Sequence, residues 1–296
     1  MRVAGLGILS GASGGPSDGP STVAGGLAGE HILAPLIASQ GSATTDQVRV
    51  AAALARSTDA SLHVSDPVAG GDAPAPGPRA DLTAEAEERI LDWAVERVSP
   101  PGPRRVGISG ARTLARGILG AVERHDVDTL VVPGGSAAGL LRRGLTERLA
   151  VHADCDVVTV AGNTGYERVP SVLLAVADGP HSGLATDVAG RVAAENDAWV
   201  DVLHVVPEDP PDRRREAARA CVEAATERIG RPGSTSTWVL EAADPAEAIV
   251  EQSQYYGLTV VGAPTKGRLR RFIAGSTTGS VRREARSVVL SVRNNR

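Results

Sequence analysis

From His31 onward, short apolar runs alternate with amphipathic stretches along the chain. A short apolar run bounded by turn residues is typical of a buried strand, whereas apolar residues three and four apart predict a helix. Strands that alternate with helices predict parallel βαβ units with helices on both faces of a sheet. In chain order the segments are HILAPLI, TTDQVRVAAALARS, SLHVSDPV, DLTAEAEERILDWAVERV, RRVGIS, TLARGILGAVERHDV, TLVVPGG, GLTERLAVHA and DVVTV, with an exposed Pro/Gly loop, GGDAPAPGPR, after the second strand.

The same order of elements then repeats, with a period of roughly 130 residues that indicates duplication of a whole domain. SLHV at 61–64 is similar to VLHV at 202–205, TLVVPGG at 129–135 to LTVVGAP at 258–264, and DVVTV to SVVLSV. We therefore expect one domain over 30–162 and a second over 168–294, with a linker near 161–168. His63 and His204 recur at one strand position in this alignment, which favours a packing or hydrogen-bonding role over catalysis.

Residues 1–29 are rich in Gly, Ser and Pro and contain little to bury, so we expect a flexible extension. The segment fits the G-x-S-x-G hydrolase pattern around Ser13, but that motif requires a strand before it and a helix after it. Neither is expected here. The segment also lacks the charged and apolar regions of a signal peptide.

Composition narrows the function classes. A net charge of −4 argues against a general nucleic-acid binder, and an aromatic content of 2% argues against a base-stacking reader of single strands. Cys155 and Cys221 form neither a disulfide framework nor a metal knuckle. Apolar stretches are interrupted well short of the ~20 residues of a membrane span. The sequence therefore predicts a soluble cytoplasmic protein with no membrane span and no nucleic-acid partner.

The most specific residues lie in the second copy. Its first strand runs into VADG with Asp178, and its fourth strand runs into GAPTKGRLRRFIAGS. On these residues the chain resembles two tandem domains of the universal stress protein family. Nucleotide-binding members carry a glycine, two residues, a second glycine, nine residues, and then glycine with Ser or Thr. Gly262, Gly275 and Ser276 match this spacing, whereas Thr265 stands at the second glycine's place.

The resemblance implies an α/β fold of two tandem Rossmann-like (adenine nucleotide alpha hydrolase-like) domains, each a five-stranded parallel sheet flanked by helices. It also implies that the two domains pair through their fifth strands, at 156–160 and 287–292, as a pseudo-dimer within one chain. Association of such chains into a homo-oligomer stays open.

A glycine at the end of the fourth strand allows close backbone approach, and a Gly-Ser pair opening a helix directs N–H groups at an anion. The resemblance implies that Asp178 contacts a nucleoside and that Val205 lines the adenine. It implies ATP or AMP as ligand, in the second domain only. The alternative is structural, with the glycines as turn residues, Ser276 as an N-cap and Asp178 closing a turn. The candidate residues are Asp178, Val205, Gly262, Thr265, Gly275, Ser276, Thr277 and Thr278.

The first copy lacks this pattern. In the sequence alignment Ile37 stands in the place of Asp178, and Arg143, Gly144 and Leu145 replace Gly-Ser-Thr. Ile37 accepts no hydrogen bond and Leu145 carries no hydroxyl. We expect no nucleotide there and a packing role for this domain.

Three function classes follow. The first is a regulatory stress-response protein that binds adenine nucleotide without strong turnover. The second is a scaffold of the same fold that binds no nucleotide and docks a partner protein such as a transporter or a kinase. The third is an enzyme that cleaves ATP or transfers a nucleotidyl group, although no Walker lysine and no metal-ligand spacing occur in the sequence.

Overall fold

The computed structural model describes residues 27, 29–37, 41–66, 71–72, 84–98, 108–134, 139–263 and 287–295. The first domain contains β1 (His31–Pro35), α1 (Gly41–Thr58), β2 (Ser61–Asp66), β3 (Gly71–Asp72), α2 (Ala84–Val98), α3 (Ile108–Arg124), β4 (Thr129–Pro133), α4 (Gly139–His152) and β5 (Asp156–Ala161). The second contains β6 (Ser171–Ala175), α5 (Ser182–Asn196), β7 (Trp199–Val206), α6 (Asp212–Ile229), a 3₁₀ turn (Pro232–Ser234), β8 (Thr235–Glu241), α7 (Pro245–Ser253), β9 (Leu258–Gly262) and β10 (Val288–Arg293).

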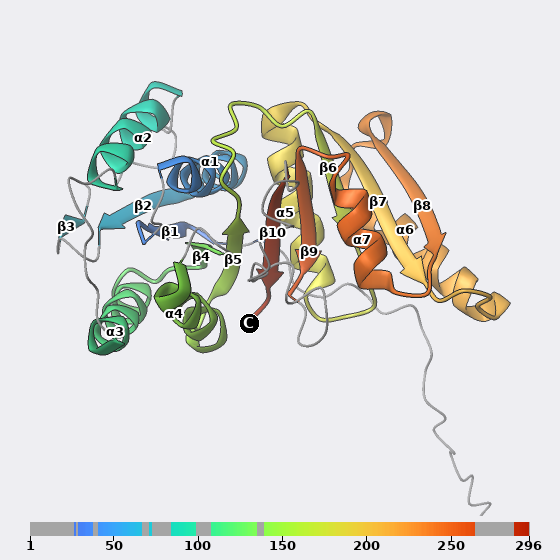
Figure 1. Ribbon diagram of the computed structural model, residues 1–296. Coiled ribbons are helices and arrows are strands. Elements are labelled where there is room, and N and C mark those ends of the chain that lie inside the picture. The colour runs from blue at the N-terminus through green and yellow to red at the C-terminus, as the bar shows by residue number, and fades with distance from the viewer. Residues whose placement is uncertain are drawn as a thin grey trace, which may run out of the picture.

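All the strands form one continuous sheet in the order β3-β2-β1-β4-β5-β10-β9-β6-β7-β8 (Figure 1). Within each domain the main strands run parallel, and the two halves meet where β5 pairs antiparallel with β10. In this pairing Val158 lies opposite Val292 and Val160 opposite Leu290. The edge strands of the two domains thus cover each other, which removes two bare strand edges from solvent.

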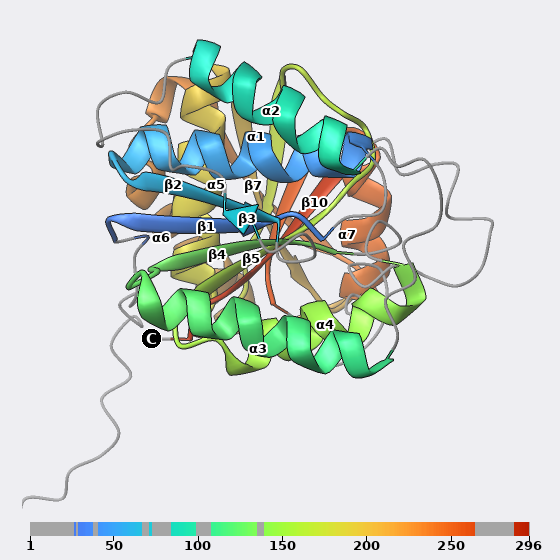
Figure 2. The same ribbon diagram turned by 90° about the vertical axis from the view of Figure 1, so that its left-hand side faces the viewer.

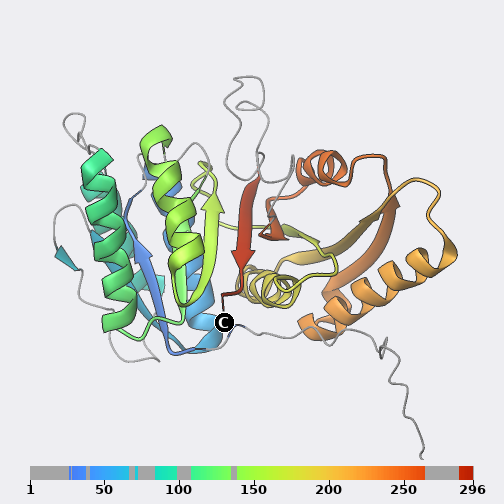
Figure 3. The ribbon, with the colours of Figure 1, turned by 90° about the horizontal axis from the view of Figure 1, so that it is seen from below.

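Helices cover both faces of the sheet. Figure 2 shows α1 and α2 on one face of the first domain and α3 and α4 on the other, and Figure 3 shows α3 and α4 side by side. The helices α1, α2, α5 and α6 all contribute to one hydrophobic core that crosses the domain boundary. Val and Ala dominate this core, because branched side chains suit a pleated surface and alanine allows helices to approach closely.

The interface between the halves also carries polar contacts. The guanidinium of Arg56 on α1 donates to Glu195 on α5 at 2.7 Å, and Arg191 of α5 donates to the carbonyl of Ser57 at 2.8 Å. Arg56 also pairs with Glu87 of α2. The expected intramolecular pairing is therefore built from a strand pair, a helix pair and these side-chain bridges.

One predicted strand, RRVGIS, is wrong in its last two residues. Ile108 and Ser109 of RRVGIS belong to helix α3, and residues 104–107 lie outside the described residues. The apolar residues at 108, 111, 115, 118 and 122 are spaced three and four apart, so the helical period already begins at Ile108. The second domain has the expected five parallel strands. The described part of the first domain has four parallel strands, and the short strand β3 lies at the edge of the sheet beside β2.

That short strand corrects a second expectation. Gly71 and Asp72 fall in the Pro/Gly stretch that we expected to be loop, yet they pair antiparallel with Asp66 and Ser65 of β2. Two residues are too few for an alternating apolar pattern to appear in the sequence.

Leu27 and Gly29, at the end of the predicted extension, contact the rest of the protein. The N–H of Leu27 donates to Asp187 at 2.8 Å, and Leu27 packs against the shared core. Gly29 has φ +147° and lies directly against Asp128, which leaves no room for a Cβ atom. Residues 1–26 and 28 lie outside the described residues.

No helix within the described ranges combines the length and apolar character needed to cross a bilayer.

Candidate functional site

The candidate site lies where the strand order of the second domain reverses. Strands β6 and β9 are neighbours in the sheet, yet the chain leaves one for β7 and reaches the other only after α7. In open α/β sheets ligands bind outside the carboxyl ends of the strands at such a point. Asp178 follows the end of β6 by three residues, and Gly262 is the last residue of β9. The fold therefore brings these two predicted residues to the same end of adjacent strands.

Asp178 lies in an exposed turn that local hydrogen bonds hold before α5. The N–H of Ser182 donates to the carbonyl of Gly179 at 3.2 Å, and its hydroxyl donates to the carbonyl of Ala177. Ser182, rather than Asp178, thus closes the turn. Among the described residues none donates a hydrogen bond to the Asp178 carboxylate, which leaves its oxygens available to a ligand.

Gly262 has a structural reason to be glycine. A Cβ atom at this position would lie 3.2 Å from Cβ of His181, the residue that precedes α5. His181 is held there because its Nδ1 accepts the N–H of Asn294 at 3.1 Å. Burial and the nearby Arg293 lower the pKa of His181 below its usual value. The close approach of His181 is therefore enough to explain a glycine at position 262, with or without a ligand.

His204 and Asp178 interact at this edge of the sheet. Burial lowers the pKa of His204, while the charge of Asp178 opposes this shift and that of Arg214 adds to it. Nδ1 of His204 is buried and has no hydrogen-bond partner among the described residues. The charge of Asp178 also acts on Cys221 of α6. Burial, together with that charge, raises the pKa of the Cys221 thiol to about 11. Arg214 and Cys221 lie far from Asp178 in sequence, and no motif indicated them.

Val205 is half-buried on β7, where it lies opposite Leu240 of β8. Consecutive strand residues point to opposite faces of a sheet. His204 shares its face with Val202, which belongs to the core under α5 and α6. The side chain of Val205 therefore points to the α7 side, away from the imidazole of His204.

The phosphate-binding part of the prediction falls outside the described residues. This applies to Thr265, Gly275, Ser276, Thr277 and Thr278, and to the basic residues Lys266, Arg268, Arg270 and Arg271. Within the described ranges, no group of three or more His, Cys, Asp or Glu side chains has the geometry to hold a metal ion.

In the first domain, two buried side chains pack beside the ends of β1 and β4. Ile37 is fully buried in the core under α3 and α4. The amide of Gln47 on α1 donates to the carbonyls of Pro35 and Val131, both at 2.9 Å, and so bridges β1 and β4. Val188 stands at the same position of α5 and is apolar. Gln47 and Val188 are both fully buried, so this helix position belongs to the core of each domain.

The strand register and the helix register give neighbouring residues of the first domain as the counterpart of Asp178. Ile32 lies opposite Thr129, and Val172 lies opposite Leu258, the residue that aligns with Thr129. Counting six residues from each gives Ala38 as the counterpart of Asp178. Counting back four residues from the first residues of α1 and α5, Gly41 and Ser182, gives Ile37, because the connection in the second domain is one residue longer. Ala38 lies outside the described residues, and an alanine side chain likewise accepts no hydrogen bond.

The two histidines that matched in sequence are not equivalent in the sheet. Leu33 lies opposite His63, whereas its counterpart Leu173 lies opposite Asp201, three residues before His204. An odd offset moves a side chain to the other face of the sheet. Accordingly, Nε2 of His63 lies 3.3 Å from Nδ1 of His31, and its ring stacks on His125 at 5.4 Å between centroids. The match of the three letters LHV in sequence gave no sign of this three-residue difference in register.

Comparison with known proteins agrees with the tandem α/β fold. The family model described as "Universal stress protein family" matches residues 30–161 and again 169–293. A comparison with curated protein sequences found no relative.

Among solved structures, the chain is similar to the cytoplasmic domain of a prokaryotic cation chloride cotransporter, with 11% identity, a TM-score of 0.53, and coverage of 90% of this chain and 96% of that one. It is also similar to a universal stress protein from Archaeoglobus fulgidus DSM 4304, with 15% identity, a TM-score of 0.49, and coverage of 90% and 97%. A third structure is a universal stress protein in complex with cAMP, with 20% identity, a TM-score of 0.32, and coverage of 42% and 97%.

Proposed function

Since the chain belongs to the universal stress protein family, we propose that it is a regulatory protein of the stress response that binds one adenine nucleotide per chain. The site is in the second domain. The observation that carries this proposal is the meeting of Asp178 and Gly262 at the carboxyl ends of β6 and β9, where the strand order reverses. The unoccupied hydrogen-bonding capacity of the Asp178 carboxylate supports a contact with the nucleoside.

The ligand we propose is AMP or ATP. Gly275 and Ser276 would supply backbone N–H groups to its phosphates, with the hydroxyls of Thr277 and Thr278 beside them. Thr265 replaces the motif's second glycine, and a side chain at that position narrows the space for phosphates. We therefore expect AMP or ADP to bind more tightly than ATP.

The asymmetry of the two domains supports a single site. In the first domain Gln47 bridges Pro35 and Val131, and Ile37 is packed into the core.

Two further parts of the proposal rest on sequence. The lack of a Walker lysine favours regulation over turnover. Two cysteines without a disulfide pattern are typical of a cytoplasmic protein, which is the location we propose.

Titration calorimetry with AMP, ADP and ATP tests the proposal. We expect one site per chain in the wild type, at least a tenfold loss of affinity in Asp178→Ala, and no binding in Gly275→Val, where a bulky side chain blocks approach to the backbone. Glu88→Ala is the matched control, because Glu88 is an exposed carboxylate on α2 of the other domain. Two equal sites, or unchanged affinity in both site variants, would overturn the assignment.

The second candidate is a scaffold that binds a partner protein and no nucleotide. The similarity over 90% of this chain to the cytoplasmic domain of a cotransporter favours this alternative. The same calorimetry distinguishes the two candidate functions, because the absence of heat with all three nucleotides would favour the scaffold.

A further inference from the structure

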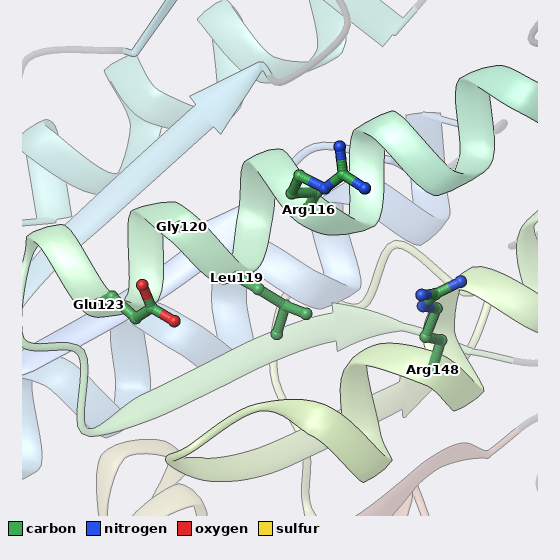
Figure 4. A pocket seen from close by; sticks show the side chains of 5 residues that line it. All are labelled: Arg116, Leu119, Gly120, Glu123 and Arg148. Carbon is green, nitrogen blue, oxygen red and sulfur yellow. The ribbon is translucent and has the colours of Figure 1, made fainter.

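A hollow lies between α3 and α4 on the outer face of the first domain, away from the candidate nucleotide site. Its volume is about 570 Å³, and its lining residues are Arg116, Leu119, Gly120, Glu123 and Arg148 (Figure 4). Four of these come from α3 and Arg148 comes from α4. Small-molecule sites typically have volumes of ~300–1,000 Å³, so this hollow has the size of a metabolite site.

Gly120 leaves open space on the α3 side of the hollow. No heavy atom lies within 4 Å of the position that a Cβ atom would take on Gly120. Leu119 is half-buried, packs against the core beneath α3, and forms the apolar part of the lining. A glycine inside a helix costs about 1 kcal/mol relative to alanine. Helix stability therefore gives no reason for Gly120, and the missing side chain leaves room for a ligand in the hollow.

The charges in the hollow are arranged with opposite signs at opposite ends. In Figure 4 the guanidinium groups of Arg116 and Arg148 lie toward one end and the carboxylate of Glu123 toward the other. Neither arginine forms an ion pair or a hydrogen bond with the residues that the structure describes. This distinguishes them from Arg228, which binds Asp187 through two nitrogens at 2.6 and 2.8 Å.

We propose that this hollow binds a small phosphate monoester whose body carries hydroxyl or ammonium groups. Two guanidinium groups from separate helices are suited to the several oxygens of a phosphate dianion, because each offers paired N–H donors. The carbon body of the ligand lies over Leu119 and Gly120. A hydroxyl or ammonium group at its far end donates to Glu123, which disfavours ligands that are anionic at both ends.

The site is independent of the proposed nucleotide site, since it belongs to the other domain. To keep the two apart, binding is measured by calorimetry on the full chain both as wild type and as Gly275→Val, the variant designed to block the nucleotide site. The probe is glycerol 3-phosphate, with glycerol as the uncharged control. We expect the same single binding event in both chains and none with glycerol. Binding in the wild type that disappears in Gly275→Val would overturn the proposal.

Arginine variants test the anion contact. Arg116→Ala and Arg148→Ala should each weaken binding of glycerol 3-phosphate about tenfold or more, since hydrogen bonds between charged groups are lost. Arg219→Ala is the matched control, because Arg219 is an exposed arginine on α6 without an ion pair among the described residues. Unchanged affinity in both lining variants would overturn the proposal. Inorganic phosphate that binds as tightly as the ester would overturn the role of Leu119 and Glu123.

A filling variant tests the hollow without removing charge. Gly120→Leu places a side chain in the open space and raises helix propensity, so it should fold and lose binding. Gly117→Leu is its control, because Gly117 is an exposed glycine of the same helix, has equally open space, and does not line the hollow. Equal affinity in Gly120→Leu and Gly117→Leu would contradict the proposed location.

Discussion

Asp46 and Asp187 occupy the same position in α1 and α5, the sixth residue of each helix, and each binds the segment that leads into the other domain. Asp46 accepts the N–H groups of Thr164 and Tyr166, just before β6 of the second domain, at 2.9 and 3.1 Å. Asp187 accepts the N–H of Leu27, just before β1 of the first domain, at 2.8 Å. Each domain therefore binds, through an aspartate of its first helix, the segment that precedes the first strand of the other domain.

Replacing Asp46 by asparagine should lower the free energy of unfolding by about 1–3 kcal/mol. Both carboxylate oxygens of Asp46 accept backbone N–H groups, so the amide of an asparagine would direct its own N–H₂ at one of these donors. Urea unfolding of the full chain measures the loss. Asp92→Asn on the exposed face of α2 is the control. A loss no greater than that of the control would mean that Asp46 does not hold the linker.

The alternation of strands and helices could be predicted because each element carries its own apolar period. The contacts of Asp46 could not, since nothing local marks an aspartate in α1 as the partner of Thr164, 118 residues later. The register of equivalent strands in the two domains was also hard to predict. The LHV match placed His63 and His204 together, although the backbone register separates them by three residues and puts them on opposite faces.

At the candidate site, the closeness of Asp178 and Gly262 could be predicted because parallel strands end at a common edge. The approach of Arg214 to His204 and of Cys221 to Asp178 could not, because it depends on how α6 packs across the sheet. The structural need for glycine at position 262 was also invisible in sequence, since it arises from His181, which is held by Asn294.

Asn295 joins the end of the second domain to the first. Its side-chain amide donates to the carbonyls of Ala150, Ala153 and Cys155, each at 3.1 Å, where α4 ends. Asn295→Ala should lower the free energy of unfolding by about 1 kcal/mol and speed amide exchange of Ala153. Gln254→Ala is the control, because Gln254 is an exposed amide at the end of α7. Equal effects of the two variants in urea unfolding and amide exchange would contradict the bridging role.

Truncation should distinguish the beginning of the chain from the residues next to β1. Deleting residues 2–25 should leave the free energy of unfolding unchanged, because it keeps Leu27 and Gly29. Deleting residues 2–29 should lower it by about 1–3 kcal/mol, since the apolar contact of Leu27 and its bond to Asp187 are lost. Thermal and urea unfolding of both chains make the comparison. Equal stability would show that Leu27 contributes nothing.

Acidification should destabilise the protein through His204. Burial and Arg214 lower its pKa in the folded state, so between that pKa and the ordinary value of 6.5 the unfolded chain binds more protons. Stability therefore rises with pH across this window and falls as the pH drops from 7.5 toward 5.5. His204→Gln should reduce the difference between urea unfolding at these two pH values, whereas His152→Gln at the exposed end of α4 should not. An unchanged pH dependence in His204→Gln would contradict the assignment.

The same imidazole reports on Asp178. The carboxylate of Asp178 raises the pKa of His204 against the effects of burial and Arg214, so Asp178→Ala should lower that pKa further. Titration of the His204 ring by NMR in the wild type and in Asp178→Ala measures the change directly. Glu88→Ala, on the other domain, should leave the titration unaltered. A His204 pKa that does not move in Asp178→Ala would show that the two side chains do not share the edge of the sheet on which the nucleotide site is proposed.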